Sequence, residues 1–409
     1  MGSNLKFCDY FNYPHEIKEH FNKIIDLLKS YNVISVILLG SGARGELIYE
    51  IKKNGIKIYS DYDILIVVNN YKYAKKLKDS LLKLNYEMKK SIMFNLDFKL
   101  ITMNQLFSLP KDTYTYSLKN RSLVIWGKDI RNSIPDVRLY NIDMKKENED
   151  IIKVLWYVLY YMPSSLFYNN SKTESLMKGF KFIICKYALQ IVPWFLLLEG
   201  NLINSIDVSK GVEFIKREYH KLYFFNFIGK EFLTQLELFN EGYFHLEFNI
   251  GTRELYDKFV NYIFNALKYL IYRETSLEAD SENIVEYLMN NASLLFNDCM
   301  LKARMLSFIS LFRNLISLRN YDIRLMYPFI FRKNAFITSL LLSLHFSLRD
   351  YFMGNENFYH SLKFIEKYFG KIKSYSNEEV LNFLLRSKQS LVDFILTFSY
   401  YPWLPFIRK

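Results

Sequence analysis

The stretch from residue 33 to residue 68 constrains the fold of this chain more than any other. It holds two short apolar runs, 33–39 and 64–68, each bounded by glycine, asparagine or charged residues. Such runs predict buried β-strands. The first run leads into the segment GSGARGE at 40–46, and Asp61-Tyr62-Asp63 stands directly before the second. The sequence therefore predicts two strands that each carry chemically active residues at one end.

Asp61 and Asp63 are one residue apart at the entrance to the second predicted strand. Residues two apart on a strand project from the same face, so the two carboxylates are expected side by side. Like charges this close disfavour each other's ionisation unless a cation neutralises them. Hard cations such as Mg²⁺ take one or two carboxylates together with substrate phosphates. The pair therefore predicts a metal site, and a solvated strand entrance is the plainer alternative.

Further elements are expected within the first 140 residues. Apolar spacing predicts helices over 14–30, 71–84 and 114–123, and a helix starting within 43–49. Asn54-Gly55 between roughly alternating residues predicts a β-hairpin. A strand expected over 95–102 would put Asn95, Asp97 and Lys99 on one face, so Asp97 is a third carboxylate near the pair. An exposed edge-strand carboxylate is the alternative for Asp97.

From about residue 143 the apolar residues recur with helical spacing. Helices are expected over 145–162, 173–199, 208–221, 229–240, 252–274, 282–318, 333–352, 356–369 and 377–399. The polar loop 274–281 suggests a boundary within this part. The predicted fold is α+β, with a small mixed sheet and flanking helices, followed by a large all-α region. The expected domains are 1–140, 141–278 and 279–409.

Cysteine usage and hydropathy indicate a cytoplasmic chain that does not span a membrane. The three cysteines are far apart and lack the spacing of a zinc site or a disulfide framework: Cys8, Cys185 and Cys299. No apolar signal segment stands near residue 1. The most hydrophobic window, 182–198, contains Lys186, Gln190 and Pro193. A buried core helix kinked near Pro193 is the preferred interpretation, and no membrane partner is expected.

The net charge of +12 over 409 residues is concentrated in the first 140 residues. A positive field around the predicted site would attract an anionic substrate. Solvated lysine-rich helix faces explain the same charge without any function, and the two interpretations stay open.

Gly40, Gly42 and Gly45 also match the G-x-G-x-x-G fingerprint of dinucleotide-binding folds. A dinucleotide-dependent oxidoreductase is therefore an alternative. Three features count against it: the acidic residues precede the second strand, a hairpin signal replaces the crossover helix, and the later sequence lacks alternating strands and helices.

The order strand, Gly40-Ser41, spacer, Asp61-x-Asp63, strand, with Asp97 on a later strand, resembles the nucleotidyltransferase superfamily typified by DNA polymerase β. The fuller form GSGARGE…SDYDILIVV resembles its small bacterial and archaeal branch, which includes minimal nucleotidyltransferases and kanamycin-type enzymes. The resemblance covers roughly residues 15–135. It implies a catalytic domain over 1–140, followed by a helical domain that binds the acceptor.

The resemblance implies a role for each matched residue. Asp61, Asp63 and Asp97 would be the catalytic carboxylates and hold two Mg²⁺ (or Mn²⁺) ions, with Asp97 nearest the acceptor. Gly40, Ser41 and Arg44 would bind the nucleotide. Glu46 is expected to be structural.

The implied reaction is transfer of a nucleoside monophosphate from an NTP, in the first place ATP, to a hydroxyl acceptor with release of pyrophosphate. A small-molecule acceptor is favoured, and a protein hydroxyl or an RNA 3′ end are the alternatives. A catalytically silent nucleotide-binding module is a further alternative. The sequence leaves the acceptor, the nucleotide and the oligomeric state open. The hairpin near Asn54 is expected to lie beside the site and help select a substrate.

Overall fold

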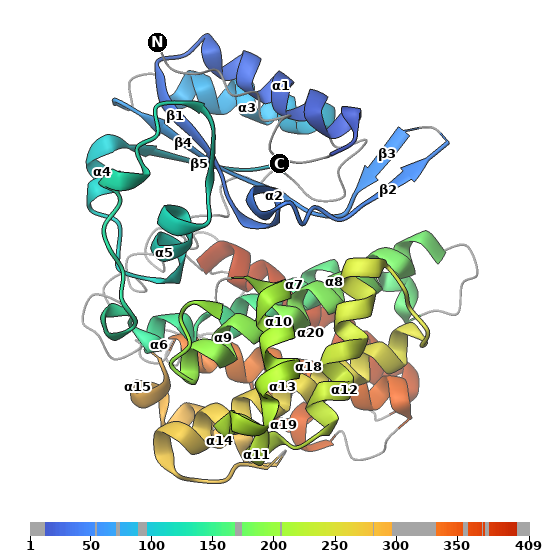
Figure 1. Cartoon of the computed structure of the whole chain (residues 1–409). Helices are drawn as coiled ribbons and strands as arrows, with labels where there is room; N and C mark the ends of the chain where they lie inside the picture. The colour runs from blue at the N-terminus through green and yellow to red at the C-terminus, as the bar shows by residue number, and fades with distance from the viewer. Residues whose placement is uncertain are drawn as a thin grey trace. The chain divides into compact units, whose positions relative to one another are not determined.

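The chain is of mixed α/β type, with a small sheet in its N-terminal part and helices through most of the rest (Figure 1). The computed structural model describes residues 13–53, 55–70, 74–88, 96–167, 174–204, 207–280, 282–296, 333–354, 359–369, 371–372 and 376–398. Two compact units are present, Met1–Asp143 and Met144–Lys409, hereafter the N-terminal unit and the helical unit. The further boundary that the sequence indicates near residue 278 stays a prediction.

The sheet of the N-terminal unit has the strand order β5-β4-β1-β6. Its strands are β1 (Val33–Leu38), β4 (Tyr62–Val68), β5 (Leu96–Thr102) and β6 (Leu123–Gly127). Strand β1 is antiparallel to both of its neighbours, β4 and β6. Strands β4 and β5 are parallel and are connected through helix α3 (Ala74–Met88). As a result, the end of β1 and the beginnings of β4 and β5 meet at one edge of the sheet, hereafter the site edge.

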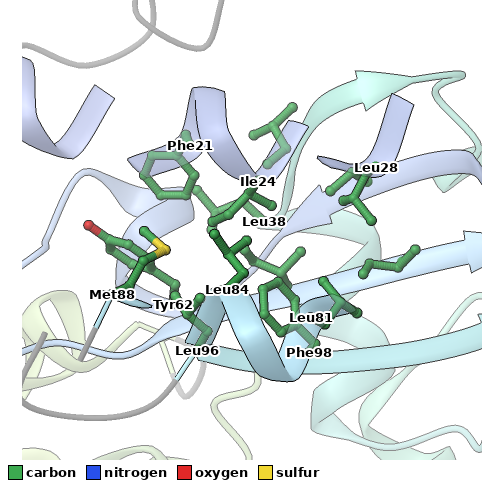
Figure 2. Close-up of a cluster of buried hydrophobic side chains, with 14 of the residues drawn as sticks. Phe21, Ile24, Leu28, Leu38, Tyr62, Leu81, Leu84, Met88, Leu96 and Phe98 are labelled. Atoms are coloured by element: carbon green, nitrogen blue, oxygen red, sulfur yellow. The ribbon is translucent and has the colours of Figure 1, made fainter. Parts of the chain in front are cut away.

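One face of the sheet is covered by α1 (His15–Lys29) and α3, which lie side by side (Figure 1). The apolar residues of α1 recur every three or four positions, so they form one stripe toward the strands. Figure 2 shows how side chains from both helices and three strands interdigitate: Phe21, Ile24, Leu28, Leu38, Tyr62, Leu81, Leu84, Met88, Leu96 and Phe98. We call this side the closed face.

The opposite side, hereafter the open face, carries α4 (Met103–Phe107) and α5 (Thr113–Asn120). A capping box between Thr102 and Gln105 starts α4, and the Asp112 side chain caps α5 by accepting from the amide of Thr115 at 2.8 Å. The sequence does not predict α4, since five residues carry too little periodicity. The buried cluster on this side is smaller: Ile37, Leu39, Leu65, Val67, Ile101, Leu106, Leu118, Ile130 and Ile134. Short 3₁₀ turns follow at Arg131–Ser133 and Leu139–Asn141.

Between β1 and β4 the chain forms helix α2 (Gly40–Arg44) and a hairpin of β2 (Tyr49–Lys52) and β3 (Gly55–Ile58). The predicted hairpin is present, although Asn54 lies outside the described residues. Strand β3 is anchored because Ile56 and Ile58 join the buried cluster of the closed face, whereas Ile51, the β2 partner of Ile56, is 72% exposed. In Figure 1 the hairpin extends away from the four-stranded sheet.

The prediction of a helix starting within 43–49 is wrong, because the helix forms earlier, on the glycine segment itself. It stops at Gly45, whose backbone is left-handed with a φ of 80°. A glycine in this conformation commonly ends a helix, and the chain then continues into β2.

The helical unit consists, in its described part, of helices and their connections. Its α-helices are α6 (Met144–Glu147), α7 (Asp150–Tyr161), α8 (Glu174–Leu189), α9 (Ile191–Leu198), α10 (Val208–Glu218), α11 (Tyr223–Ile228), α12 (Glu231–Asn240), α13 (Thr252–Thr275), α14 (Ile284–Asn290), α15 (Ala292–Leu295), α18 (Lys333–Met353), α19 (Tyr359–Phe369) and α20 (Asn377–Phe398). Shorter 3₁₀ turns lie at Ser164–Leu166 and Tyr219–Lys221, and a π-helical turn at Glu241–His245. The predicted helix 282–318 is described only up to residue 296, and its remaining part lies outside the described residues.

The apolar stretch 174–198 forms two successive helices, so the predicted helix is interrupted at Gln190, close to the kink predicted near Pro193. Helix α8 ends at Leu189 and α9 begins at Ile191, so Pro193 falls in the first turn of α9, where a missing amide hydrogen leaves no hydrogen bond unmade. By length and composition the 25-residue stretch Glu174–Leu198 could cross a membrane, but 83% of its apolar window is buried inside the structure. This degree of burial is typical of a core helix.

A polar contact between Tyr256 and His345 lies deep inside the helical unit. The Tyr256 hydroxyl is 2.6 Å from Nδ1 of His345, and Nε2 of that ring is 2.9 Å from the carbonyl oxygen of Leu155. Burial lowers the pKa of His345 to about 4. The neutral ring therefore donates to the Leu155 carbonyl through Nε2 and accepts from Tyr256 at Nδ1. This contact ties α7, α13 and α18 together.

Candidate active site

Two of the three predicted carboxylates lie on adjacent strands at the site edge. Asp63 of β4 is the register partner of Asp97 of β5. Their strand neighbours Tyr62, Ile64 and Phe98 point into the closed face, so both carboxylates project from the open face. Parallel neighbours are about 4.8 Å apart in the hydrogen-bonding direction, and both side chains are partly buried. Asp97 therefore stands beside Asp63, while Asp61 lies just before β4 and is also partly buried.

Gly40 lies directly against the carboxylate of Asp63. A Cβ atom at Gly40 would overlap Oδ2 of Asp63 and would lie 3.4 Å from its Cγ. The backbone of Gly40 is also left-handed, with a φ of 59°, which disfavours any residue with a side chain. A hydrogen bond from the amide of Leu39 to the carbonyl of Asp63, at 2.8 Å, holds the two segments together. The glycine segment and the Asp pair therefore meet at one point.

Ser41 and Arg44 lie on helix α2 at the same end of the sheet. Ser41 is partly buried, and its carbonyl oxygen accepts from the amide of Glu46 at 2.9 Å. The Arg44 guanidinium donates through Nε to Glu46 at 2.8 Å, and these side chains are only 15% and 18% exposed. The pairing orients the Arg44 guanidinium, and the structural role expected for Glu46 stays a prediction. A phosphate contact by Arg44 stays a prediction.

Tyr62, between the two aspartates, anchors the start of β4 from the closed face. Its buried ring packs against Phe21 at 4.7 Å between centroids (Figure 2), and its hydroxyl is 3.2 Å from Nδ1 of His20. Burial raises the pKa of Tyr62 and lowers that of His20, so both groups are neutral at pH 7. The alternation of β4 thus drives Tyr62 inward and Asp63 outward. No sequence motif marks Tyr62 or His20 for this role.

Lys99 and Tyr114 also belong to this group, although sequence reasoning gave neither a function. Lys99 is two residues beyond Asp97 and projects from the same face. Its ammonium nitrogen is 4.0 Å from the centroid of the Tyr114 ring. Burial raises the pKa of Tyr114, and the negative charges of Asp63, Asp97 and Asp112 raise it further. The Tyr114 phenol therefore stays protonated in the field of the carboxylates. The shared face of Asp97 and Lys99 was readable from β alternation, whereas no sequence signal linked Tyr114 to them.

A ready-made metal cage is absent among the residues that the structure describes, since no group of three or more His, Cys, Asp or Glu side chains is arranged to share an ion. Asp63 and Asp97 nevertheless offer two carboxylates on adjacent strands. Mg²⁺ commonly takes one or two carboxylates and completes its shell with water and substrate phosphates. The donor set of this edge therefore fits a cation that arrives together with an anionic substrate.

The topology around the glycine segment differs from that of a dinucleotide-binding unit. That unit requires a strand, a glycine turn, a crossover helix and a parallel neighbouring strand. Here β1 has antiparallel neighbours on both sides, and the short helix α2 is followed by a hairpin. Local structure explains both glycines without a dinucleotide. Gly40 leaves room for the Asp63 carboxylate, and Gly45 adopts the left-handed backbone that ends α2.

No model of a known protein family, no curated protein and no solved structure matches this chain.

Proposed function

We propose that the chain is a metal-dependent nucleotidyltransferase and that the site edge of the N-terminal unit is its active site. The observation that carries this proposal is the register pairing of Asp63 with Asp97 directly against Gly40. Three segments that the resemblance treats as one functional set, Gly40-Ser41, Asp61-x-Asp63 and Asp97, converge there from separate places in the sequence. Folding alone does not require two adjacent carboxylates, Asp63 and Asp97, next to a glycine that leaves room for one of them.

In the proposed reaction an acceptor hydroxyl oxygen attacks the α-phosphorus of an NTP. The new P–O bond forms as the bond to the bridging oxygen breaks, pyrophosphate leaves, and the hydroxyl proton passes to a carboxylate or to water. Asp61, Asp63 and Asp97 would hold two Mg²⁺ or Mn²⁺ ions, which supply charge stabilisation for the entering and leaving oxygens. Asp97 would serve as the proton acceptor, and Gly40, Ser41 and Arg44 would contact the nucleotide.

The acceptor is proposed to be a small molecule, with ATP as the first donor to test and the cytoplasm as the place of reaction. A protein hydroxyl and an RNA 3′ end are the alternative acceptors. The experiment distinguishes them, because labelled small molecules, proteins and RNA can be told apart. Binding of the nucleotide without any transfer would identify a silent nucleotide-binding module instead.

The decisive experiment is incubation of the full chain with each α-labelled NTP, Mg²⁺ or Mn²⁺, and cell extract. Asp63→Asn and Asp97→Asn are expected to lower label transfer by about 10²- to 10³-fold or more, because each removes charge at the reacting centre. Asp79→Asn is the matched control, since Asp79 is exposed on α3 over the closed face. Product size and sensitivity to nuclease or protease identify the acceptor class. Absence of both transfer and NTP binding in the wild type would refute the proposal.

A further inference from the structure

Lys99 and Tyr114 form a defined pair beside the two carboxylates. Lys99 belongs to β5 and Tyr114 to the first turn of α5, and the ammonium nitrogen lies 4.0 Å from the ring centroid. A cation in this position is attracted by the electron-rich ring face, so the ring restricts where the ammonium can go. The Lys99 side chain is partly buried, whereas the hydroxyl oxygen of Tyr114 is fully buried. The Tyr114 ring therefore holds the positive charge of Lys99 in a defined position at the site edge.

The location of Tyr114 is set by α5. The Asp112 cap fixes the first turn of this helix, and Leu118, one turn further on, is buried in the cluster of the open face. The charges of Asp63 and Asp97 act on the Tyr114 phenol. The Tyr114 ring therefore stands near these carboxylates and holds Lys99 in the same region.

We infer that Lys99 supplies the cation of a polyphosphate subsite at this edge and that the Tyr114 ring positions it, because the ammonium nitrogen lies over that ring. The inference deepens the proposed function and rests on it. It goes beyond the motif residues, because neither side chain belongs to the glycine segment or to the Asp-x-Asp pattern. The ligand class is a linear di- or triphosphate complexed with a divalent cation.

The charges explain why the ligand must be a metal complex. Two adjacent carboxylates repel a bare polyphosphate, and an ammonium group repels a bare divalent cation. A Mg²⁺–triphosphate complex presents a cation to Asp63 and Asp97 and phosphate oxygens to Lys99, so each opposing charge is matched. Binding of metal and of polyphosphate should therefore be mutually dependent, as linkage requires.

The test measures binding of inorganic triphosphate, diphosphate and monophosphate to the full chain by calorimetry, with and without Mg²⁺. Wild type should bind more tightly as the phosphate chain lengthens, and only with Mg²⁺ present. Lys99→Met should weaken triphosphate binding about tenfold or more and flatten the dependence on chain length, whereas Lys99→Arg should restore most of both. Tyr114→Phe keeps the ring under Lys99 and should bind triphosphate nearly as the wild type does, whereas Tyr114→Leu removes the ring and should weaken binding a few-fold. A merely structural lysine would not change the dependence on chain length.

Lys83→Met is the matched control, because Lys83 is exposed on α3 over the closed face and its loss changes the net charge equally. A folded Lys99→Met variant that binds triphosphate as the wild type does would overturn the inference while leaving the nucleotidyltransferase proposal intact. A wild type that neither transfers a nucleotide nor binds Mg²⁺–triphosphate would overturn both.

Discussion

The two faces of the small sheet are built from the same strands but carry different side chains. On the closed face β4 and β5 contribute Tyr62, Ile64, Leu96 and Phe98, all at most 2% exposed beneath α1 and α3. On the open face the corresponding positions at the site edge are Asp63 and Asp97, followed by Lys99. Apolar residues return only further along, with Leu65, Val67 and Ile101.

Alternation along one strand thus places large buried side chains on one face and carboxylates on the other, one residue apart. Burial of large apolar side chains dominates folding free energy, so the closed face holds the strands in register. The paired carboxylates contribute little to folding, since like charges directly opposite each other are unfavourable. Their positions are nevertheless fixed by the side chains that point the other way.

The largest difference between the two faces is expected when two consecutive residues of β5 are truncated in turn. Phe98→Ala should destabilise the N-terminal unit by about 3–5 kcal/mol, because it leaves a cavity in a packed core. Asp97→Ala should change stability by less than about 1 kcal/mol, since the side chain is partly exposed and its removal relieves repulsion. Hydrogen exchange of peptides from β4 and β5, read by mass spectrometry, measures both effects locally. Equal losses for the two variants would mean that the faces do not differ as described.

A second test concerns the contact between the glycine segment and the open face. Gly40→Ala combines a left-handed φ of 59° with overlap against Asp63, so a loss of about 1–3 kcal/mol and a displaced carboxylate are expected. Gly55→Ala is the control, because Gly55 also has a positive φ, 123°, but nothing lies within 4 Å of its added Cβ.

The collision can be separated from backbone strain by a double variant. Asp63→Ala in the Gly40→Ala background removes the overlapping atoms and should recover part of the lost stability in the same exchange measurement, which a double-mutant cycle quantifies. Purely additive effects would show that strain alone explains Gly40.

A third test weakens the anchor under the Asp pair. Tyr62→Phe keeps the buried ring and removes the hydroxyl that contacts His20, so a loss of about 1 kcal/mol is expected. Tyr31→Phe is the comparison, because the Tyr31 hydroxyl contacts Ser80 at 2.7 Å in a partly exposed setting where water can replace it. Denaturant unfolding followed on the N-terminal unit should show the larger loss for Tyr62. A larger loss of stability for Tyr31→Phe than for Tyr62→Phe would show that the Tyr62 hydroxyl does not anchor β4.

The smallest expected effect is a pH dependence of the closed face. Burial lowers the pKa of His20 from its ordinary value of 6.5, and the positive charge of Lys23 lowers it further, against the opposing charges of Glu19 and Glu16. The unfolded chain therefore binds a proton at His20 more readily than the folded chain does. The stability linked to His20 is complete above pH 6.5 and is lost as the pH falls toward the folded pKa.

Exchange protection of α1 and β4, measured from pH 8 to pH 5, should accordingly decline on the acid side after correction for the intrinsic exchange rate. The decline should be smaller in His20→Gln, which keeps a polar side chain but cannot titrate. An identical profile in both proteins would assign the acid sensitivity to other groups.

Much of the N-terminal unit could be predicted from local pattern. The buried strand at 33–38, the amphipathic helix α1 and the hairpin before Gly55 follow from periodicity and turn chemistry, and each forms near its predicted position. The errors occur where a few residues carry little periodicity. Helix α4 was missed, α2 begins on the glycine segment, and the helix expected over 173–199 breaks at Gln190.

Local sequence pattern assigned each candidate residue to one strand face, because a period of two is a local property. It determined that Asp61 and Asp63 stand at the entrance of β4 and that Asp97 and Lys99 share a face. Only the tertiary structure decided that β5 pairs with β4 in a register that sets Asp97 beside Asp63, and that α5 brings Tyr114 against Lys99. The physical reason is that strand pairing and helix packing are chosen by the burial of the whole closed and open faces, which sums over side chains distant in the sequence.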